Sequence, residues 1–175
     1  RTFFYVSHRT AVPRPWVLSL TKPADDDPEI LNPLGVQALN KGDVAGARAY
    51  LESAYRKAPS SPQLALDYCR VLDKIGDQTG ILRVAQPLAA AGRYEFYQLL
   101  GRAHQALGQL PEAVAAYKEY LNRMGTNIEV LNAVGDCQLQ LGDPAGALAA
   151  WEKSLELNPQ QEAVRQKVKA ARASQ

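Results

Sequence analysis

The sequence predicts an all-α protein. We expect a right-handed superhelical solenoid of about four helix hairpins, a C-terminal capping helix, and a short extended or β segment at the N-terminus. Alanine and leucine dominate a composition that is 46% hydrophobic, and β-branched residues are few after residue 22, which favours helix over sheet. Apolar residues recur at steps of three and four, as on one face of a helix. Related segments also recur at a fixed spacing, which is the signature of a repeat architecture.

The N-terminal element, residues 1–27, differs from the rest of the chain. The stretches TFFYVSHRT and WVLSLTK are rich in aromatic and β-branched residues, so residues 1–22 are predicted to form two short strands or extended segments. The acidic linker KPADDDPE follows. Because two strands alone are marginally stable in water, another surface must bury the large apolar side chains of this segment: Phe3, Phe4, Tyr5 and Trp16. Three covers remain open: the solenoid's own surface, a neighbouring subunit, or the rest of a β-domain that precedes Arg1.

A repeat accounts for the remainder of the chain. The stretch GDPAGALAAWEKSLELNP, which begins at Gly142, echoes GDVAGARAYLESAYRKAP, which begins at Gly42. Between these copies, a spacing of 34 separates Gly101 from Gly135, Gly108 from Gly142, Leu107 from Leu141, and Ala113 from Ala147. One unit is two residues shorter. The units are therefore placed at 28–61, 62–93, 94–127 and 128–161.

Each unit carries matching residues at matching places. Small residues stand where the two helices of a unit cross: Gly35, Cys69, Gly101 and Gly135. The turn glycines are Gly42, Gly76, Gly108 and Gly142. The second helices carry Ala47, Ile81, Ala113 and Ala147, and then Leu51, Ala85, Tyr117 and Trp151. Pro59 and Pro159 close the first and fourth units, while Gly125 stands at the end of the third. With its spacing of 34, the chain resembles the tetratricopeptide repeat family over about three-quarters of its length.

Glycine and capping residues predict where the helices begin and end. Glycine at each hairpin turn permits the positive φ that ends the first helix. Asp27-Pro28, Ser61-Pro62 and Asp143-Pro144 each suit an N-cap followed by proline at the first helical position.

Two internal prolines predict irregular helices. Pro87 lies inside the second helix of the second unit and is expected to kink or break it near Gln86, because proline removes a backbone hydrogen bond. Pro33 similarly predicts that the first helix begins properly at Asn32, which would act as its cap.

The last element, residues 162–175, is predicted to be a capping helix. Val164, Val168 and Ala171 form a thin apolar stripe. Cations cover much of the remaining surface: Arg165, Lys167, Lys169 and Arg172. This pattern suits a terminal helix whose outer face is solvated. A basic patch that binds an anion or a partner is the alternative.

Composition excludes several classes of function. A formal net charge of +2 is too small to indicate nucleic-acid or acidic-membrane binding, and no apolar run approaches the length of a membrane span. The chain opens at Arg1, so we expect a processed or excised segment. It would be soluble and either cytoplasmic or exported, and its compartment is not indicated.

No catalytic or metal-binding pattern emerges, and we expect neither an enzyme nor a cofactor. Ser7-His8 lacks a third group that would orient a base, and His104 falls at a packing or groove-edge position. Asp25-Asp26-Asp27 lacks the spacing of a calcium loop. Cys69 and Cys137 have no metal-ligand spacing and are expected to be core residues.

The family resemblance implies protein binding, because the first helices of such units line a concave groove. The outward-facing residues of these helices are Asn32, Val36, Arg70, Gln98, Arg102, Gln105, Asn132, Asp136 and Gln140. Arg70 and Arg102 share one offset within their units, and Asn32, Gln98 and Asn132 share another. Amides can pair with an extended peptide backbone, and arginines can hold a carboxylate, so the set suits an extended acidic segment. A solvated polar face is the alternative.

Three functional hypotheses follow. The first is a scaffold or adaptor that binds a peptide or protein segment in the groove. The second is a structural or accessory subunit of a larger assembly, including a homo-oligomer, in which residues 1–22 contact a neighbour. The third is the docking portion of an enzyme whose catalytic domain precedes Arg1. Some family members bind a C-terminal carboxylate through a lysine, but Asn32 stands at the matching place here, so that activity is not assigned.

Overall fold

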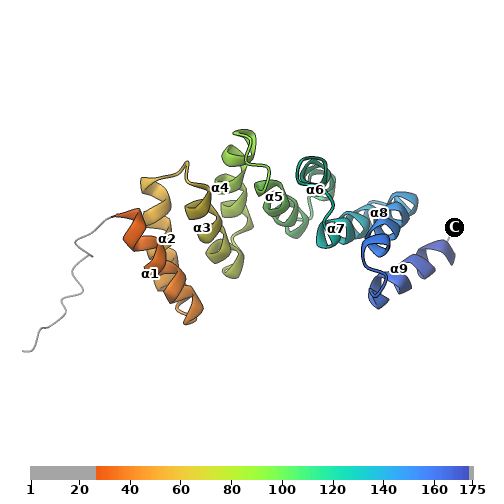
Figure 1. Ribbon diagram of the computed structural model, residues 1–175, viewed down its shortest axis with the longest axis horizontal. Coiled ribbons are helices and arrows are strands. Elements are labelled where there is room, and N and C mark those ends of the chain that lie inside the picture. Colours follow the sequence, from red (N-terminus) through yellow and green to blue (C-terminus); the bar gives the residue numbers. More distant parts are fainter. Residues whose placement is uncertain (1–26, 174–175) are drawn as a thin grey trace, which may run out of the picture.

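The computed structural model describes residues 27–173, and all nine elements in that part of the chain are α-helices. They follow one another along an arched rod, with α1 at one end and α9 at the other (Figure 1). In order, they are α1 (Pro28–Asn40), α2 (Val44–Lys57), α3 (Pro62–Lys74), α4 (Gln78–Ala90), α5 (Phe96–Ala106), α6 (Leu110–Met124), α7 (Ile128–Gln140), α8 (Pro144–Leu157) and α9 (Glu162–Ala173). The all-α prediction is confirmed for these residues, whereas the strands predicted within residues 1–22 lie outside them.

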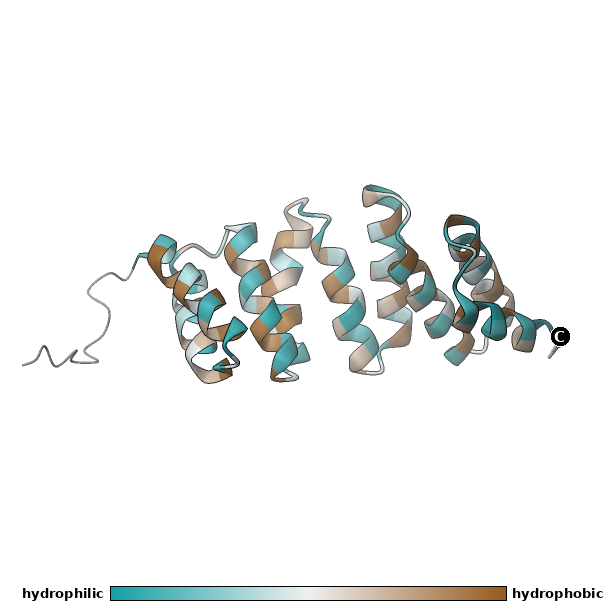
Figure 2. Ribbon diagram, turned by 60° about the horizontal axis from the view of Figure 1, so that its bottom comes forward, coloured by the Kyte–Doolittle hydropathy of each residue, from teal (hydrophilic) through white to brown (hydrophobic). Residues whose placement is uncertain are grey.

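The core runs along the rod instead of forming a single centre. Each helix packs on the next helix in the chain, and α1 also contacts α3. One cluster joins α2 to α6 through residues such as Leu72 and Phe96, and another joins α8 to α9 through Trp151 and Val168. Each hairpin leaves its apolar side uncovered, and the neighbouring hairpins cover that side, as expected for stacked repeats. Hydrophobic residues accordingly recur in helices along the whole rod (Figure 2).

Glycine lets the two helices of a hairpin approach closely where they cross. A Cβ atom on Gly101 would lie 2.4 Å from Cδ1 of Tyr117, and one on Gly135 would lie 2.3 Å from Nε1 of Trp151. Both rings are almost completely buried. Gly101 and Gly135 are therefore equivalent points of neighbouring hairpins, as the spacing of 34 predicts. Cys69 is also buried, and burial raises the pKa of its thiol to about 12.

An aspartate caps the N-terminus of the second helix in three of the hairpins. The carboxylates of Asp43, Asp77 and Asp143 accept hydrogen bonds from the backbone N–H three residues later, at 2.8–2.9 Å. Glycine stands at each of these third positions, and a Cβ atom there would lie 2.2–2.5 Å from the capping carboxylate. The pattern Asp-x-x-Gly is therefore a structural unit. The turn glycines that precede these caps have the predicted positive φ.

The Asp77 cap makes folding stability depend on pH. The backbone N–H of Gly80, and secondarily the hydroxyl of Thr79 at 3.0 Å, hold the pKa of the Asp77 carboxyl below its usual value. A lowered folded-state pKa stabilises the protein above the unfolded-state pKa of about 3.9, and this contribution is lost as the pH falls through the folded-state value. Asp77→Asn retains a capping acceptor that does not titrate. We expect the stability advantage of the wild type over Asp77→Asn, measured by urea unfolding, to shrink below about pH 4. A difference in unfolding free energy between the wild type and Asp77→Asn that stays constant down to about pH 3 contradicts this expectation.

Both internal prolines lie within continuous helices, which contradicts the predicted break at Pro87 and the predicted start of the first helix at Asn32. Helix α4 continues through Pro87 to Ala90 without a break, because Val84 and Leu88 on either side of the proline are buried in the core. Helix α1 begins at Pro28 and not at Asn32. Its cap is Asp27, which accepts a hydrogen bond from the N–H of Glu29 at 2.9 Å. Packing and an earlier cap outweigh the local cost of each proline.

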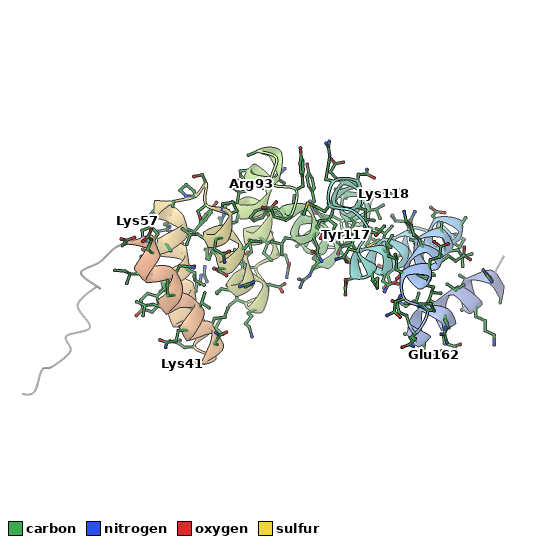
Figure 3. The ribbon with its side chains drawn as sticks, viewed as in Figure 1. Lys41, Lys57, Arg93, Tyr117, Lys118 and Glu162 are labelled. Atoms are coloured by element: carbon green, nitrogen blue, oxygen red, sulfur yellow. The ribbon has the colours of Figure 1, made fainter. Side chains whose placement is uncertain are left out.

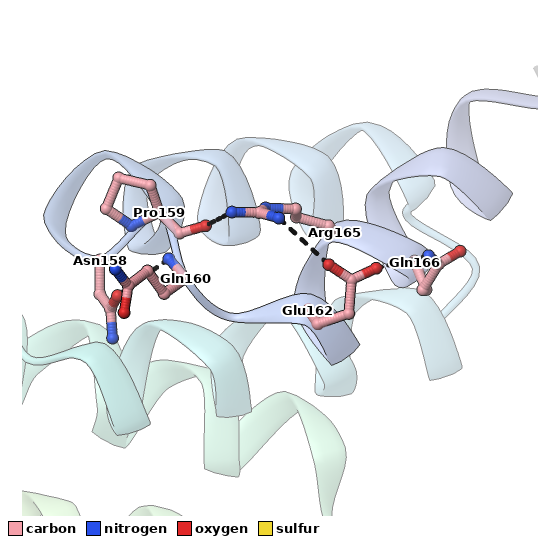
Figure 4. Close-up of polar contacts among 6 residues, drawn as sticks. All are labelled: Asn158, Pro159, Gln160, Glu162, Arg165 and Gln166. Carbon is pink, nitrogen blue, oxygen red and sulfur yellow. Dashed lines mark hydrogen bonds and ion pairs between the residues drawn. The ribbon is translucent and has the colours of Figure 1, made fainter.

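The connection between α8 and α9 is held by polar contacts (Figure 4). Arg165 donates to the carbonyl of Pro159 and pairs with Glu162 at 3.1 Å. Gln160 donates its backbone N–H to Asn158 at 3.0 Å. These contacts fix the start of α9, and the predicted apolar stripe of this helix packs on α8.

Candidate functional site

The nine predicted site residues lie on helices that form one row. We call α1, α3, α5, α7 and α9 the odd-numbered row. Polar contacts link neighbouring members of this row: Asn32 with Asp67, Asp73 with Arg102, and Asp136 with Lys167. The predicted residues are Asn32 and Val36 on α1, Arg70 on α3, Gln98, Arg102 and Gln105 on α5, and Asn132, Asp136 and Gln140 on α7. They follow the row in sequence order.

Asp67 organises the first half of this row. Asp67 is only 2% exposed. Its carboxylate accepts hydrogen bonds from Asn32 Nδ2 at 3.1 Å, Gln63 Nε2 at 2.8 Å and Arg70 Nη1 at 2.7 Å. One buried carboxylate therefore positions side chains from both α1 and α3. The sequence reasoning missed Asp67. Its signal was a single charge in the otherwise apolar stretch LALDYC.

The two candidate arginines are already paired within the chain. Arg70 bonds Asp67, and Arg102 Nη2 lies 2.9 Å from Asp73 Oδ2, which joins α5 to α3. Their side chains nevertheless remain 65% and 56% exposed. A guanidinium has five N–H donors, so each retains donors that face solvent.

Asn132 occupies in α7 the place that Asn32 occupies in α1, and the two make parallel contacts. Asn132 Nδ2 donates to Gln161 Oε1 at 2.7 Å, and Gln161 in turn donates to the buried Ser154. Asn32 thus donates its amide N–H to the following unit, whereas Asn132 donates to the residue that immediately precedes α9. The Oδ1 atom of each is buried without a hydrogen-bond partner among the described residues.

The remaining predicted residues differ in availability. Tyr117 lies on α6 (Figure 3), and its hydroxyl donates a hydrogen bond to Gln105 Oε1 at 2.9 Å. Burial raises the pKa of that phenol. Asp136 pairs with Lys167 at 2.6 Å. Val36 packs partly buried against the core, whereas Gln140 is exposed. Val36 is therefore an apolar part of the row and not a polar contact.

Two hollows open on the odd-numbered row. The first lies at the start of α1 and α3 and is mostly apolar, with Asn32, Pro33 and Leu64 among its lining residues. The second is lined by Asp73, Gln78, Arg102, Gln105 and Ala106. Three of the predicted residues therefore line hollows.

The cations of α9 are largely paired. Arg165, Lys167 and Arg172 form ion pairs with Glu162, Asp136 and Glu152. These contacts favour the solvated-cap interpretation of α9 over a basic patch.

Histidine and acidic side chains form no further site in the described part of the chain. His104 is half-buried, with Nδ1 2.7 Å from Gln109 Oε1. Within residues 27–173, no group of three or more His, Cys, Asp or Glu is arranged to hold a metal ion. None of the helices in this range combines the length and apolar character that crossing a membrane requires.

The row of hairpins and its polar contacts define a helical repeat protein of the solenoid class. Three sequence profiles, each described as tetratricopeptide repeat, match residues 20–72, 94–123 and 128–161. The chain belongs to the tetratricopeptide repeat family.

Solved structures share this fold at low sequence identity. A MamA protein is 18% identical with a TM-score of 0.77, and the alignment covers 82% of this chain and 80% of that one. A tetratricopeptide repeat protein from Parabacteroides merdae is 21% identical with a TM-score of 0.74, covering 84% and 60%. The APC/C hetero-tetramer Cut9–Hcn1 contains a chain that is 20% identical with a TM-score of 0.71, covering 84% and 30%. No curated protein matches the sequence.

Proposed function

We propose that the chain is a protein-interaction scaffold whose odd-numbered row binds an extended segment of a partner protein. The observation that carries this proposal is the series of polar side chains that follows the row across four hairpins, with Arg70 and Arg102 paired yet more than half exposed. Membership of the tetratricopeptide repeat family supports it. The similarity to a chain of the Cut9–Hcn1 hetero-tetramer is consistent with a role in a protein complex.

The chemistry of the row favours an extended segment with acidic side chains. The exposed guanidinium groups can hold a carboxylate with the donors that Asp67 and Asp73 leave free. Gln98 and Gln140 can pair with the peptide backbone. The hollow beside Arg102 would receive one acidic side chain of the ligand.

The finer architecture is part of the same proposal. We place the repeat units at 28–61, 62–93, 94–127 and 128–161, in a right-handed solenoid that residues 162–175 cap. The four hairpins from α1–α2 to α7–α8 fall within these ranges. The charged outer surface of α9 supports its role as a cap.

A second candidate function is an accessory subunit of a larger assembly, in which residues 1–22 contact a neighbour. The observation that favours it is the exposure of Ile30 and Leu34 on α1, the first described helix after that segment in the sequence. The experiment in the next subsection separates contact with a neighbour from contact within one chain.

The groove proposal is tested with peptides selected by the wild-type protein from a random display library. We expect the selected peptides to be rich in Asp and Glu. Arg102→Ala, and the double variant Arg70→Ala with Arg102→Ala, should weaken their binding about tenfold or more, since a hydrogen bond to a charged group contributes about 1.5–3 kcal/mol. Fluorescence anisotropy measures the affinities.

The matched control is Arg123→Ala on α6. Arg123 is 52% exposed and pairs with Glu119 at 2.8 Å, so this variant removes an equivalent charge and ion pair away from the odd-numbered row. Its affinity should equal that of the wild type. Equal losses for Arg102→Ala and Arg123→Ala would mean that the row has no special role.

A further inference from the structure

Helix α1 has a free face that no other described helix covers. Leu31 packs between α2 and α3, and a Cβ atom on Gly35 would approach Leu51 of α2. Asn32 faces α3 through its bond to Asp67. At 100° per residue, Ile30 and Leu34 lie on the side away from both neighbours, one turn apart. Their exposed fractions are 41% and 36%.

The two ends of the rod therefore differ. On α9, the surface away from α8 carries exposed polar and charged residues such as Gln166 and Lys169. This end of the rod therefore presents a solvated polar face. At the other end, hydrophobic residues occur in the first turns of α1 (Figure 2). The other exposed large aliphatic residues of the described chain do not form such a pair on the free side of an end helix. Single exposed aliphatic residues are ordinary, whereas a terminal repeat normally presents a polar outer face, so an aliphatic pair on the free face of α1 calls for a cover.

We propose that the free face of α1 binds the segment Trp16–Leu20 of the same chain. The segment reads WVLSL and offers one aromatic and three aliphatic side chains to the Ile30–Leu34 pair. This proposal is independent of peptide binding by the odd-numbered row. It selects the solenoid's own surface among the covers that the sequence leaves open for the N-terminal aromatic residues.

Chain length allows this contact. Leu20 is separated from Asp27 by a linker that spans up to about 25 Å when extended. Leu34 lies only about 10 Å along the axis of α1 from Asp27, at 1.5 Å per residue. The segment can therefore turn back along α1 and reach both aliphatic side chains.

The same tether favours this occupant over a second copy of the chain. Attachment through a short linker gives the segment an effective concentration on the order of millimolar, which exceeds the micromolar concentration of a second molecule in solution. The contact should consequently form in the monomer and be independent of protein concentration.

Trp16 reports on the proposed contact directly. The only other tryptophan is Trp151, which is fully buried in α8, so the full chain with Trp151→Phe leaves Trp16 as the single emitter. We expect blue-shifted Trp16 emission and acrylamide quenching several-fold weaker than in urea, both unchanged between low and high micromolar protein. Leu34→Glu in this background should restore solvent-like emission and quenching. Circular dichroism checks that each variant remains helical.

The control is Leu139→Glu on α7, where the wild-type side chain is 46% exposed and distant in the chain from α1. It should leave Trp16 emission unchanged. If Trp151→Phe does not fold, the unaltered chain labelled with 5-fluorotryptophan gives a ¹⁹F line for Trp16, assigned with Trp16→Phe, and Leu34→Glu should shift it. Solvent-like Trp16 in the parent chain, or no response to Leu34→Glu, overturns the proposal. Protection that appears only at high protein concentration also overturns it and assigns the face to a second copy.

Discussion

Replacing Gly135 by alanine should lower the free energy of unfolding by about 2–3 kcal/mol, because overpacking a filled core costs about 1–3 kcal/mol or more. The added Cβ would lie 2.3 Å from Nε1 and 2.5 Å from Cδ1 of Trp151. That ring is rigid and 0% exposed, so it cannot rotate out of the way. Alanine is otherwise the better helix former by about 1 kcal/mol, and a loss of stability would therefore come from the collision alone. Urea unfolding at equilibrium measures the change.

A double-mutant cycle isolates this contact. In a Trp151→Leu background the smaller side chain leaves room for the new methyl group, so Gly135→Ala should cost little or should stabilise the protein there. The coupling between the two positions should exceed about 1 kcal/mol, as expected for residues in direct contact. Gly101→Ala against Tyr117 provides an independent repeat of the measurement in the preceding unit. If Gly135→Ala is as stable as the wild type, the two helices are not held together as closely as the structure indicates.

The sequence predicts these crossing points because the information is local and periodic. A glycine that recurs at a spacing of 34, with an aromatic residue at a fixed distance after it, fixes both partners of the contact. The turn glycines and the Asp143 cap are equally local. The helix that continues through Pro87 is not predictable in this way, because buried neighbours on other helices outweigh the proline.

The candidate site was only partly predictable for the same reason. Projection of the helices placed Arg70 and Arg102 on one row of the solenoid, but it could not show that each pairs with an aspartate. The pairing of Arg102 with Asp73 joins two units that are separated along the chain. The role of Asp67 is not predictable from the sequence, because it depends on Asn32, a residue of the preceding hairpin.

Asp67→Ala should reduce stability by about 2 kcal/mol, because hydrogen bonds to a charged group contribute about 1.5–3 kcal/mol. The substitution removes the acceptor of Asn32, Gln63 and Arg70 together. Removing one partner of a fully buried ion pair costs about 3–5 kcal/mol, but the Arg70 side chain is 65% exposed and remains solvated, so the loss should be smaller. Urea unfolding measures it.

Asp73→Ala is the matched control for Asp67→Ala, because it also removes an aspartate that pairs with an arginine of the odd-numbered row. The Asp73 side chain is 40% exposed, against 3% for Asp67, so its loss should cost no more than about 0.5 kcal/mol. The side-chain amide signals of Asn32 in a ¹H–¹⁵N spectrum should move in Asp67→Ala and stay in place in Asp73→Ala. Equal costs for the two variants would show that Asp67 is one more surface carboxylate. A larger cost for Asp67→Ala, together with weaker peptide binding, would mean that this buried carboxylate both stabilises the first two hairpins and holds Asn32 and Arg70 in position for a ligand.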